Sequence, residues 1–131
     1  LFRSSNTRYT MRDAALAAIY QDWDAGRYEA AVDGGESILD VQTRGVRAIR
    51  SIAESHAGET VLVVTHGRML RVLLASLLDG YTLDHMDTFD HSNTGVNELR
   101  YRQGRFEPRT LNCTAHLDGT ADPSTATLST N

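Results

Sequence analysis

With 131 residues, 40% of them hydrophobic, the chain is long enough for one modest domain with a core and too short for two ordinary domains. The formal net charge of −4 argues against a nucleic-acid-binding protein, which usually carries a basic face. The single cysteine, Cys113, excludes an internal disulfide and favours a reducing compartment such as the cytoplasm, and no apolar run is long enough to cross a membrane.

Two helices are predicted in the first half of the chain. Residues 11–23 form the first, with Thr10 as its N-cap after a polar, turn-like start. After a Gly-rich loop, the second begins near Ser37 and extends to about His56, because apolar residues recur there at three- and four-residue spacing. Gly45 argues against this second helix, because a glycine inside a helix is about 1 kcal/mol less favourable than an alanine.

The second half of the chain combines strands with one more helix. Residues 60–65, TVLVVT, are β-branched and apolar without alternation, which is typical of a fully buried strand in a parallel or mixed sheet. Residues 68–78 predict a helix that Gly80 ends. Residues 94–114 predict a β-hairpin that turns at Gly104. Residues 118–131 predict a disordered tail, which leaves residues 1–117 as the domain.

This order of elements indicates an α/β domain of layered helices and sheet. Only three strands are predicted, whereas a buried central strand needs a neighbour on each side. We therefore expect an incomplete sheet. Together with a start at Leu1, this suggests a sequence that is part of a longer protein.

His66 and Gly67 lie where the predicted buried strand passes into the next helix. The first N–H groups of a helix are unpaired and, together with the helix dipole, favour an anion such as phosphate. Gly67 would let the anion approach the backbone, while the His66 ring would donate a charge-assisted hydrogen bond or exchange a proton near neutral pH. The alternative is that His66 caps a carbonyl and Gly67 only makes the turn.

Four segments, in order, resemble the histidine phosphatase superfamily with its phosphoglycerate-mutase-like fold. They are DGGES at residues 33–37, VLVVTHGRMLRVLLASLL at 61–78, HSNTGVNELRY at 91–101 and LNCTAHL at 111–117. The resemblance covers about residues 11–117. It implies a three-layer α/β sandwich, here incomplete because the first strand is missing.

The resemblance also implies a metal-independent phosphomonoester hydrolase without a cofactor, acting on a small phosphorylated metabolite, with mutase chemistry left open. His66 matches the second catalytic histidine, which contacts the transferring phosphoryl group and stabilises its charge, and Gly67 matches the backbone beside it. Asn93 and Thr94 would lie at the edge of the pocket. Arg8 is a further candidate phosphate ligand, through the segment SSNTR.

Two parts of the family pattern are absent. The family's nucleophile is a histidine in an Arg-His-Gly triplet, and no histidine of this chain follows an Arg. The general-acid carboxylate has no counterpart either. The sequence is therefore interpreted as the C-terminal part of such an enzyme, with little or no activity alone, because phosphoryl transfer needs an in-line nucleophile. A homodimer or a missing N-terminal segment would complete the sheet, and neither nucleic acid nor membrane is expected as a partner.

Several alternatives stay open. The chain is a candidate non-catalytic module that binds phosphate or a partner protein. Residues 33–37 are more simply read as a turn in which Ser37 caps the following helix than as part of a site. Potential metal ligands cluster at Asp84, His85, Asp87, Asp90 and His91, although a solvated loop explains them as well. A substitute nucleophile would have to come from His56, His85, His91 or His116.

Overall fold

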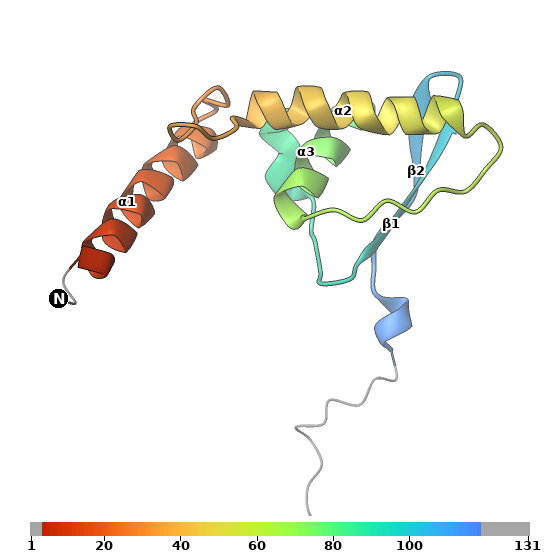
Figure 1. The fold of residues 1–131 in the computed structure, drawn as a ribbon. Coiled ribbons are helices and arrows are strands. Elements are labelled where there is room, and N and C mark those ends of the chain that lie inside the picture. Colours follow the sequence, from red (N-terminus) through yellow and green to blue (C-terminus); the bar gives the residue numbers. More distant parts are fainter. Residues whose placement is uncertain (1–3, 119–131) are drawn as a thin grey trace, which may run out of the picture.

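The structure, a computed structural model, describes residues 4–118 and the side chains of residues 14–118. The elements in chain order are α1 (Ser4–Asp24), α2 (Ile38–Ser55), α3 (Gly67–Leu77), the 3-10 helix η1 (Leu83–Thr88), strands β1 (Val96–Arg102) and β2 (Arg105–Cys113), and the 3-10 helix η2 (Ala115–Leu117). Figure 1 shows α3 beneath α2, the hairpin at one end of α2, and α1 extending away from the other end. The predicted α/β class is confirmed. Of the predicted tail, residues 119–131 lie outside the described residues.

Helix α1 begins earlier than the sequence predicts. It starts at Ser4, so the predicted start at residue 11 and the N-cap at Thr10 are wrong. Residues 4–10 contain neither Gly nor Pro, and their modest helix propensities do not break a helix that already continues downstream. The large apolar side chains of this helix are mostly uncovered, with Leu16 and Tyr20 exposed and Trp23 half-buried.

Helix α2 follows the prediction closely. Ser37 is its N-cap and His56 its C-cap. Gly45 is buried where α2 meets α3, and a Cβ atom there would lie 2.5 Å from Cε of Met69 and 3.0 Å from Cδ2 of Leu73. The glycine that weakens the helix prediction thus allows the two helices to approach closely.

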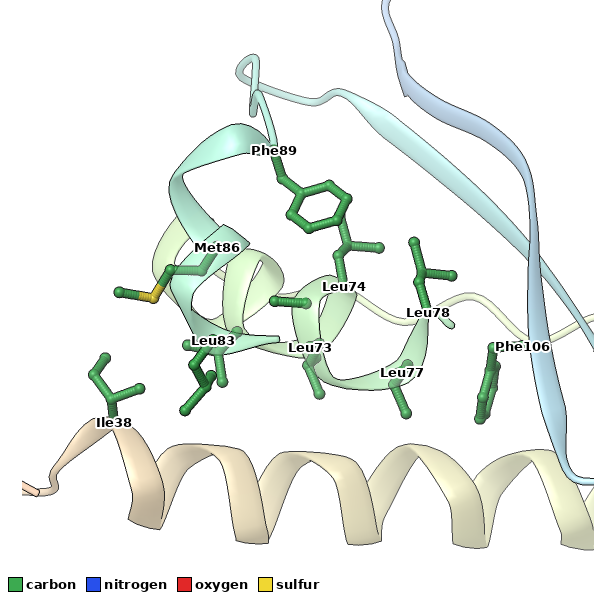
Figure 2. Packing of buried hydrophobic residues seen from close by; sticks show 11 residues of the cluster. Ile38, Leu73, Leu74, Leu77, Leu78, Leu83, Met86, Phe89 and Phe106 are labelled. Atoms are coloured by element: carbon green, nitrogen blue, oxygen red, sulfur yellow. The ribbon is translucent and has the colours of Figure 1, made fainter. Parts of the chain in front are cut away.

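The core is built around α3, whose apolar residues are buried on most sides. Val72, Leu74 and Ala75 are at most 2% exposed. Figure 2 shows the cluster between α2, α3, η1 and β2. Its members are Ile38, Val72, Leu73, Leu74, Ala75, Leu77, Leu78, Leu83, Met86, Phe89 and Phe106. The predicted helix over residues 68–78 is confirmed to within one residue at each end.

The predicted buried strand over residues 60–65 is wrong. The segment forms no strand and makes no hydrogen bond to the rest of the described chain. Leu62 and Val64 are 86% and 87% exposed, while Val61 and Val63 are 43% and 45% exposed. In Figure 1 it belongs to the yellow-green coil, without a strand arrow, that leads from the end of α2 back to α3. A β-branched sequence makes a strand only where a neighbouring strand supplies hydrogen bonds and packing, and within residues 4–118 none does so.

The predicted hairpin is confirmed. Strands β1 and β2 pair antiparallel with Arg102 opposite Arg105. The two residues between them, Gln103 and Gly104, have φ values of +49° and +78°. Positive φ at both positions is the type I′ geometry that matches the twist of the strands, which explains the glycine. Phe106 of β2 packs in the hydrophobic core and so connects the hairpin to it.

None of the helices within residues 4–118 combines the length and the apolar character that a membrane crossing requires.

Candidate functional site

A cavity of about 270 Å³ opens at the N-terminus of α3. Three parts of the chain meet there: the end of α1, the turn and first helical turns that begin α2, and residues 65–69. The lining residues are Trp23, Glu36, Ser37, Ile38, Val41, Arg44, Thr65, His66, Arg68 and Met69. The volume lies just below the range of about 300–1,000 Å³ that is typical of small-ligand pockets, which suits a metabolite of few atoms.

His66 lines this cavity and is also the residue that caps the start of α3. It is the N-cap, with extended backbone (φ −99°, ψ 156°), and its carbonyl accepts the N–H of Leu70 at 2.8 Å. Its ring is exposed and forms no hydrogen bond within residues 14–118. The alternative in which the ring caps a carbonyl is therefore wrong. The ring and the unpaired N–H groups of the first helical turn are free to meet an anion in the cavity.

Gly67 has a different structural role from the one expected. Its φ is not positive, so no unusual dihedral demands a glycine here. Instead, a Cβ atom at this position would lie 2.3 Å from Cδ2 and 2.5 Å from Nε2 of His91. The space that glycine leaves is filled by the His91 ring, which places a second imidazole beside the start of α3. No feature of the sequence indicated this contact.

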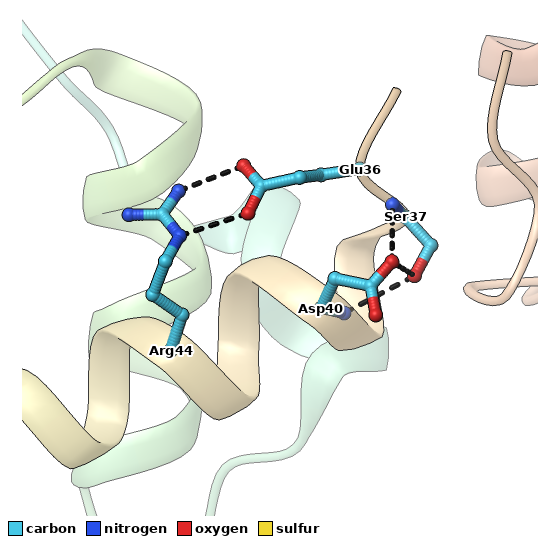
Figure 3. A network of polar contacts seen from close by, with 4 residues as sticks. All are labelled: Glu36, Ser37, Asp40 and Arg44. Atoms are coloured by element: carbon cyan, nitrogen blue, oxygen red, sulfur yellow. Dashed lines mark hydrogen bonds and ion pairs between the residues drawn. The ribbon is translucent and has the colours of Figure 1, made fainter. Parts of the chain in front are cut away.

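The turn before α2 forms two polar pairs at the cavity (Figure 3). Glu36 accepts two hydrogen bonds from Arg44, each 2.8 Å long, and this guanidinium holds the pKa of Glu36 below its usual value. Ser37 and Asp40 form a capping box in which Asp40 N–H donates to the Ser37 hydroxyl oxygen at 3.1 Å. The interpretation of residues 33–37 as a turn and helix cap is confirmed at Ser37.

Arg68, which sequence reasoning did not single out, contributes a second guanidinium to the cavity. Its Cζ atom lies 4.7 Å from the centre of the Tyr20 ring and 5.3 Å from that of Trp23. The two rings come from the last turns of α1 and meet edge to face, 5.4 Å apart. The sequence separation is too large for any local pattern to have predicted this cluster.

The remaining predicted ligands do not line the cavity. Thr94 is exposed, has φ +59°, and its hydroxyl lies 3.1 Å from Nε2 of His116. Asn93 is also exposed, in the turn that Ser92 N–H anchors to the Asn112 side chain at 2.7 Å. Arg8 belongs to α1 by its backbone, and its side chain lies outside the described residues.

The acidic and histidine residues of positions 84–91 are mostly engaged elsewhere. Asp84 accepts the Tyr28 hydroxyl, Asp87 pairs with Arg71, and His85 accepts the N–H of Thr82. Among the described residues, no three His, Cys, Asp or Glu side chains are grouped so that they could hold a metal ion.

The other candidates for a substitute nucleophile are also separated from the cavity, with one exception. His56 ends α2 and lies 3.2 Å from Glu59, and His116 contacts Thr94. The exception is His91, whose ring lies against Gly67 in the first turn of α3.

Two phosphoserine phosphatases are similar to this chain in sequence. The chain is 48% identical over 84 residues to a metal-independent phosphoserine phosphatase of Arabidopsis thaliana, an alignment that covers 64% of this chain and 33% of that protein. It is 26% identical over 98 residues to phosphoserine phosphatase 1 of Hydrogenobacter thermophilus, covering 75% of this chain and 46% of the relative. The chain thus spans between a third and a half of the length of these relatives.

The fold comparison gives a consistent result. A crystal structure of a phosphoserine phosphatase mutant from Entamoeba histolytica, in complex with phosphoserine, superposes with a TM-score of 0.66 at 22% identity. The match covers 76% of this chain and 50% of that one, and it establishes a shared fold. In sequence, the histidine phosphatase superfamily (branch 1) matches residues 6–114, which is most of the chain. This chain belongs to the histidine phosphatase superfamily.

Proposed function

We propose that the protein is a metal-independent phosphomonoester hydrolase that acts on a small phosphorylated metabolite, with phosphoserine as its substrate. The observation that carries the proposal is the free His66 ring at the N-terminus of α3, open to a cavity of metabolite size. The names of the two relatives similar in sequence support phosphoserine. The single cysteine of this chain supports the cytoplasm as the location of the protein.

In this proposal the start of α3 binds the phosphoryl group. The first backbone N–H groups of the helix donate to phosphoryl oxygens, and the helix dipole adds favourable charge. The His66 ring donates one further, charge-assisted hydrogen bond, worth about 1.5–3 kcal/mol. As negative charge redistributes over the phosphoryl oxygens during transfer, these fixed donors stabilise it without reorganising.

The proposal includes four secondary ligands of the substrate, which are Gly67, Asn93, Thr94 and Arg8. Gly67 contributes its backbone N–H, while Asn93 and Thr94, which do not line the cavity, contact the substrate only at its outer edge, from the turn before β1. Arg8 is the weakest member, because its side chain lies outside the described residues.

A second candidate function is a non-catalytic phosphate-binding module. It is favoured by one observation, that none of the five histidines follows an Arg as the family's nucleophile does. Both functions require phosphate binding at His66, but only the first requires turnover. For this chain alone we expect binding with little turnover, and a homodimer or additional chain preceding Leu1 to complete an active enzyme.

The decisive experiment combines binding and turnover on the 131-residue chain. Calorimetric titration with phosphoserine should show that His66→Ala weakens binding about 10- to 150-fold, the equivalent of one charge-assisted hydrogen bond. His56→Ala is the matched control, since His56 is an exposed histidine at the far end of α2. Equal binding by the His66→Ala variant and the unchanged chain would contradict the proposal. Release of inorganic phosphate from phosphoserine then separates the two candidate functions.

A further inference from the structure

The charges that line the cavity do not balance. Among the described residues that line it, Glu36 is the one carboxylate, and each of its two oxygens accepts a hydrogen bond from Arg44. Arg68 is the other cation of the cavity, and within residues 14–118 it has no carboxylate partner and no hydrogen bond. The cavity therefore presents one guanidinium whose charge the described residues leave uncompensated.

The position of Arg68 makes this excess charge more unusual. Arg68 is the second residue of α3, where the positive end of the helix dipole disfavours a cation. The unpaired N–H groups belong to the same turn, and the His66 ring lines the same cavity. A dianionic or trianionic ligand would relieve the repulsion among these donors, whereas a neutral ligand would not.

Two aromatic rings of α1 contact the Arg68 side chain. The guanidinium lies close to both Tyr20 and Trp23, and the Trp23 indole is itself held by donating its N–H to the Ala30 carbonyl at 2.8 Å. Stacking against a ring occupies a face of the planar guanidinium and leaves its in-plane N–H groups available. Two parallel in-plane N–H groups of a guanidinium match a carboxylate, which accepts two parallel hydrogen bonds in one plane.

We propose that Arg68 is the specificity-determining residue of this site and that it binds the carboxylate of a phosphorylated substrate, while His66 and the first turn of α3 bind its phosphoryl group. The inference rests on the proposed function and deepens it by assigning the second anionic group of the substrate. In phosphoserine, three atoms separate the phosphorus from the carboxyl carbon, so one small cavity accommodates both groups. Tyr20 and Trp23 are positioning residues that act through Arg68.

The test compares two ligands that differ only in the carboxylate, with inorganic phosphate as a reference for the phosphoryl group alone. Phosphoserine, phosphoethanolamine, which lacks the carboxylate, and inorganic phosphate are titrated into the 131-residue chain and its Arg68→Met variant. We expect Arg68→Met to weaken phosphoserine binding about tenfold or more and to change phosphoethanolamine binding less than twofold. Arg47→Met is the matched control, because Arg47 is an exposed arginine of α2 that does not line the cavity.

Each other outcome has a distinct meaning. If Arg68→Met weakens all three ligands equally, Arg68 binds the phosphoryl group and the inference is overturned. If it weakens none of them, Arg68 has no ligand and the inference is overturned as well, while the function proposed for His66 still stands. If the unchanged chain binds neither phosphoserine nor phosphate, the proposed function itself fails and the inference fails with it.

A second pair of variants tests the positioning role of the rings. Tyr20→Leu removes the aromatic face and should reduce the preference for phosphoserine over phosphoethanolamine several-fold, whereas Tyr20→Phe keeps the ring and the preference. Far-UV circular dichroism establishes that both variants are folded. An unchanged preference in a folded Tyr20→Leu variant would show that the ring does not orient Arg68.

Discussion

Replacing Ser37 with Ala tests the capping box that starts α2 and shapes the cavity. Ser37 is 5% exposed, and its hydroxyl both accepts the Asp40 N–H at 3.1 Å and donates to Oδ2 of Asp40 at 2.8 Å. Ala leaves the Asp40 N–H without this acceptor. Loss of a serine N-cap costs about 1 kcal/mol of unfolding free energy, which raises the unfolded-to-folded ratio about fivefold.

Urea unfolding followed by the fluorescence of the only tryptophan, Trp23, measures this cost. A slope of about 1–3 kcal/mol per molar urea converts 1 kcal/mol into a midpoint lower by about 0.3–1 M. Ser51→Ala is the matched control, because Ser51 is an exposed serine within α2 and Ala is at least as good a helix former. Equal midpoints for Ser37→Ala and Ser51→Ala would refute the capping argument.

The same box predicts a dependence on acid pH. The Ser37 N–H, at 2.9 Å from Oδ2, and then the Ser37 hydroxyl lower the pKa of Asp40 below its ordinary value of 3.8. A carboxylate with a lowered folded pKa stabilises the fold above its unfolded pKa, and this stability is lost as pH falls through the folded value. Asp40→Asn should therefore lose less stability than the unchanged chain between pH 5 and about pH 3. A parallel decline in both proteins would contradict this origin.

Three further predictions concern other parts of the molecule. Gly67→Ala should lower the free energy of unfolding more in the unchanged chain than in a His91→Ala background, because the added Cβ displaces the His91 ring. A double-mutant cycle that shows no coupling between the two positions would contradict the contact. Burial, and after it the hydrogen bond to Asp84, raises the pKa of Tyr28 to about 12. The absorbance at 295 nm should therefore show Tyr28 ionising near pH 12 in the unchanged chain and at a lower pH in the Asp84→Asn variant. The stability that Tyr28 contributes should be complete below pH 10 and disappear as pH rises through 12, and Tyr28→Phe should abolish this loss. Leu74→Ala should cost about 2–5 kcal/mol in thermal or urea unfolding, since Leu74 is 2% exposed, and a cost below about 1 kcal/mol would be inconsistent with a core position.

Local patterns were sufficient to predict the elements whose stability is decided locally. The α2 cap at Ser37, the amphipathic spacing of α2 and the Gly104 turn are each set by residues within a few positions of one another. The start of α1 was predicted wrongly because its polar residues resemble a turn, and the strand at residues 60–65 because strand formation is not decided locally. The first depends on the absence of a helix breaker upstream, and the second depends on a pairing partner that residues 4–118 do not provide.

The candidate site shows the same division. His66 was identified from its place before a helix, and the structure puts it at the N-cap with a free ring. Arg68 with its aromatic neighbours, and His91 against Gly67, were missed because each contact joins residues more than twenty positions apart. Only tertiary packing brings these side chains together, and no spacing rule encodes it.

The uncovered stretch of residues 61–64 has a consequence for handling the protein. Four consecutive branched aliphatic side chains, with main-chain donors and acceptors unused within residues 4–118, form a ready template for intermolecular cross-β stacking. Turbidity and thioflavin fluorescence should therefore rise with protein concentration. Exchanging Leu62 and Val64, the two outward-facing side chains, for Thr should delay that rise while leaving the thermal midpoint in place.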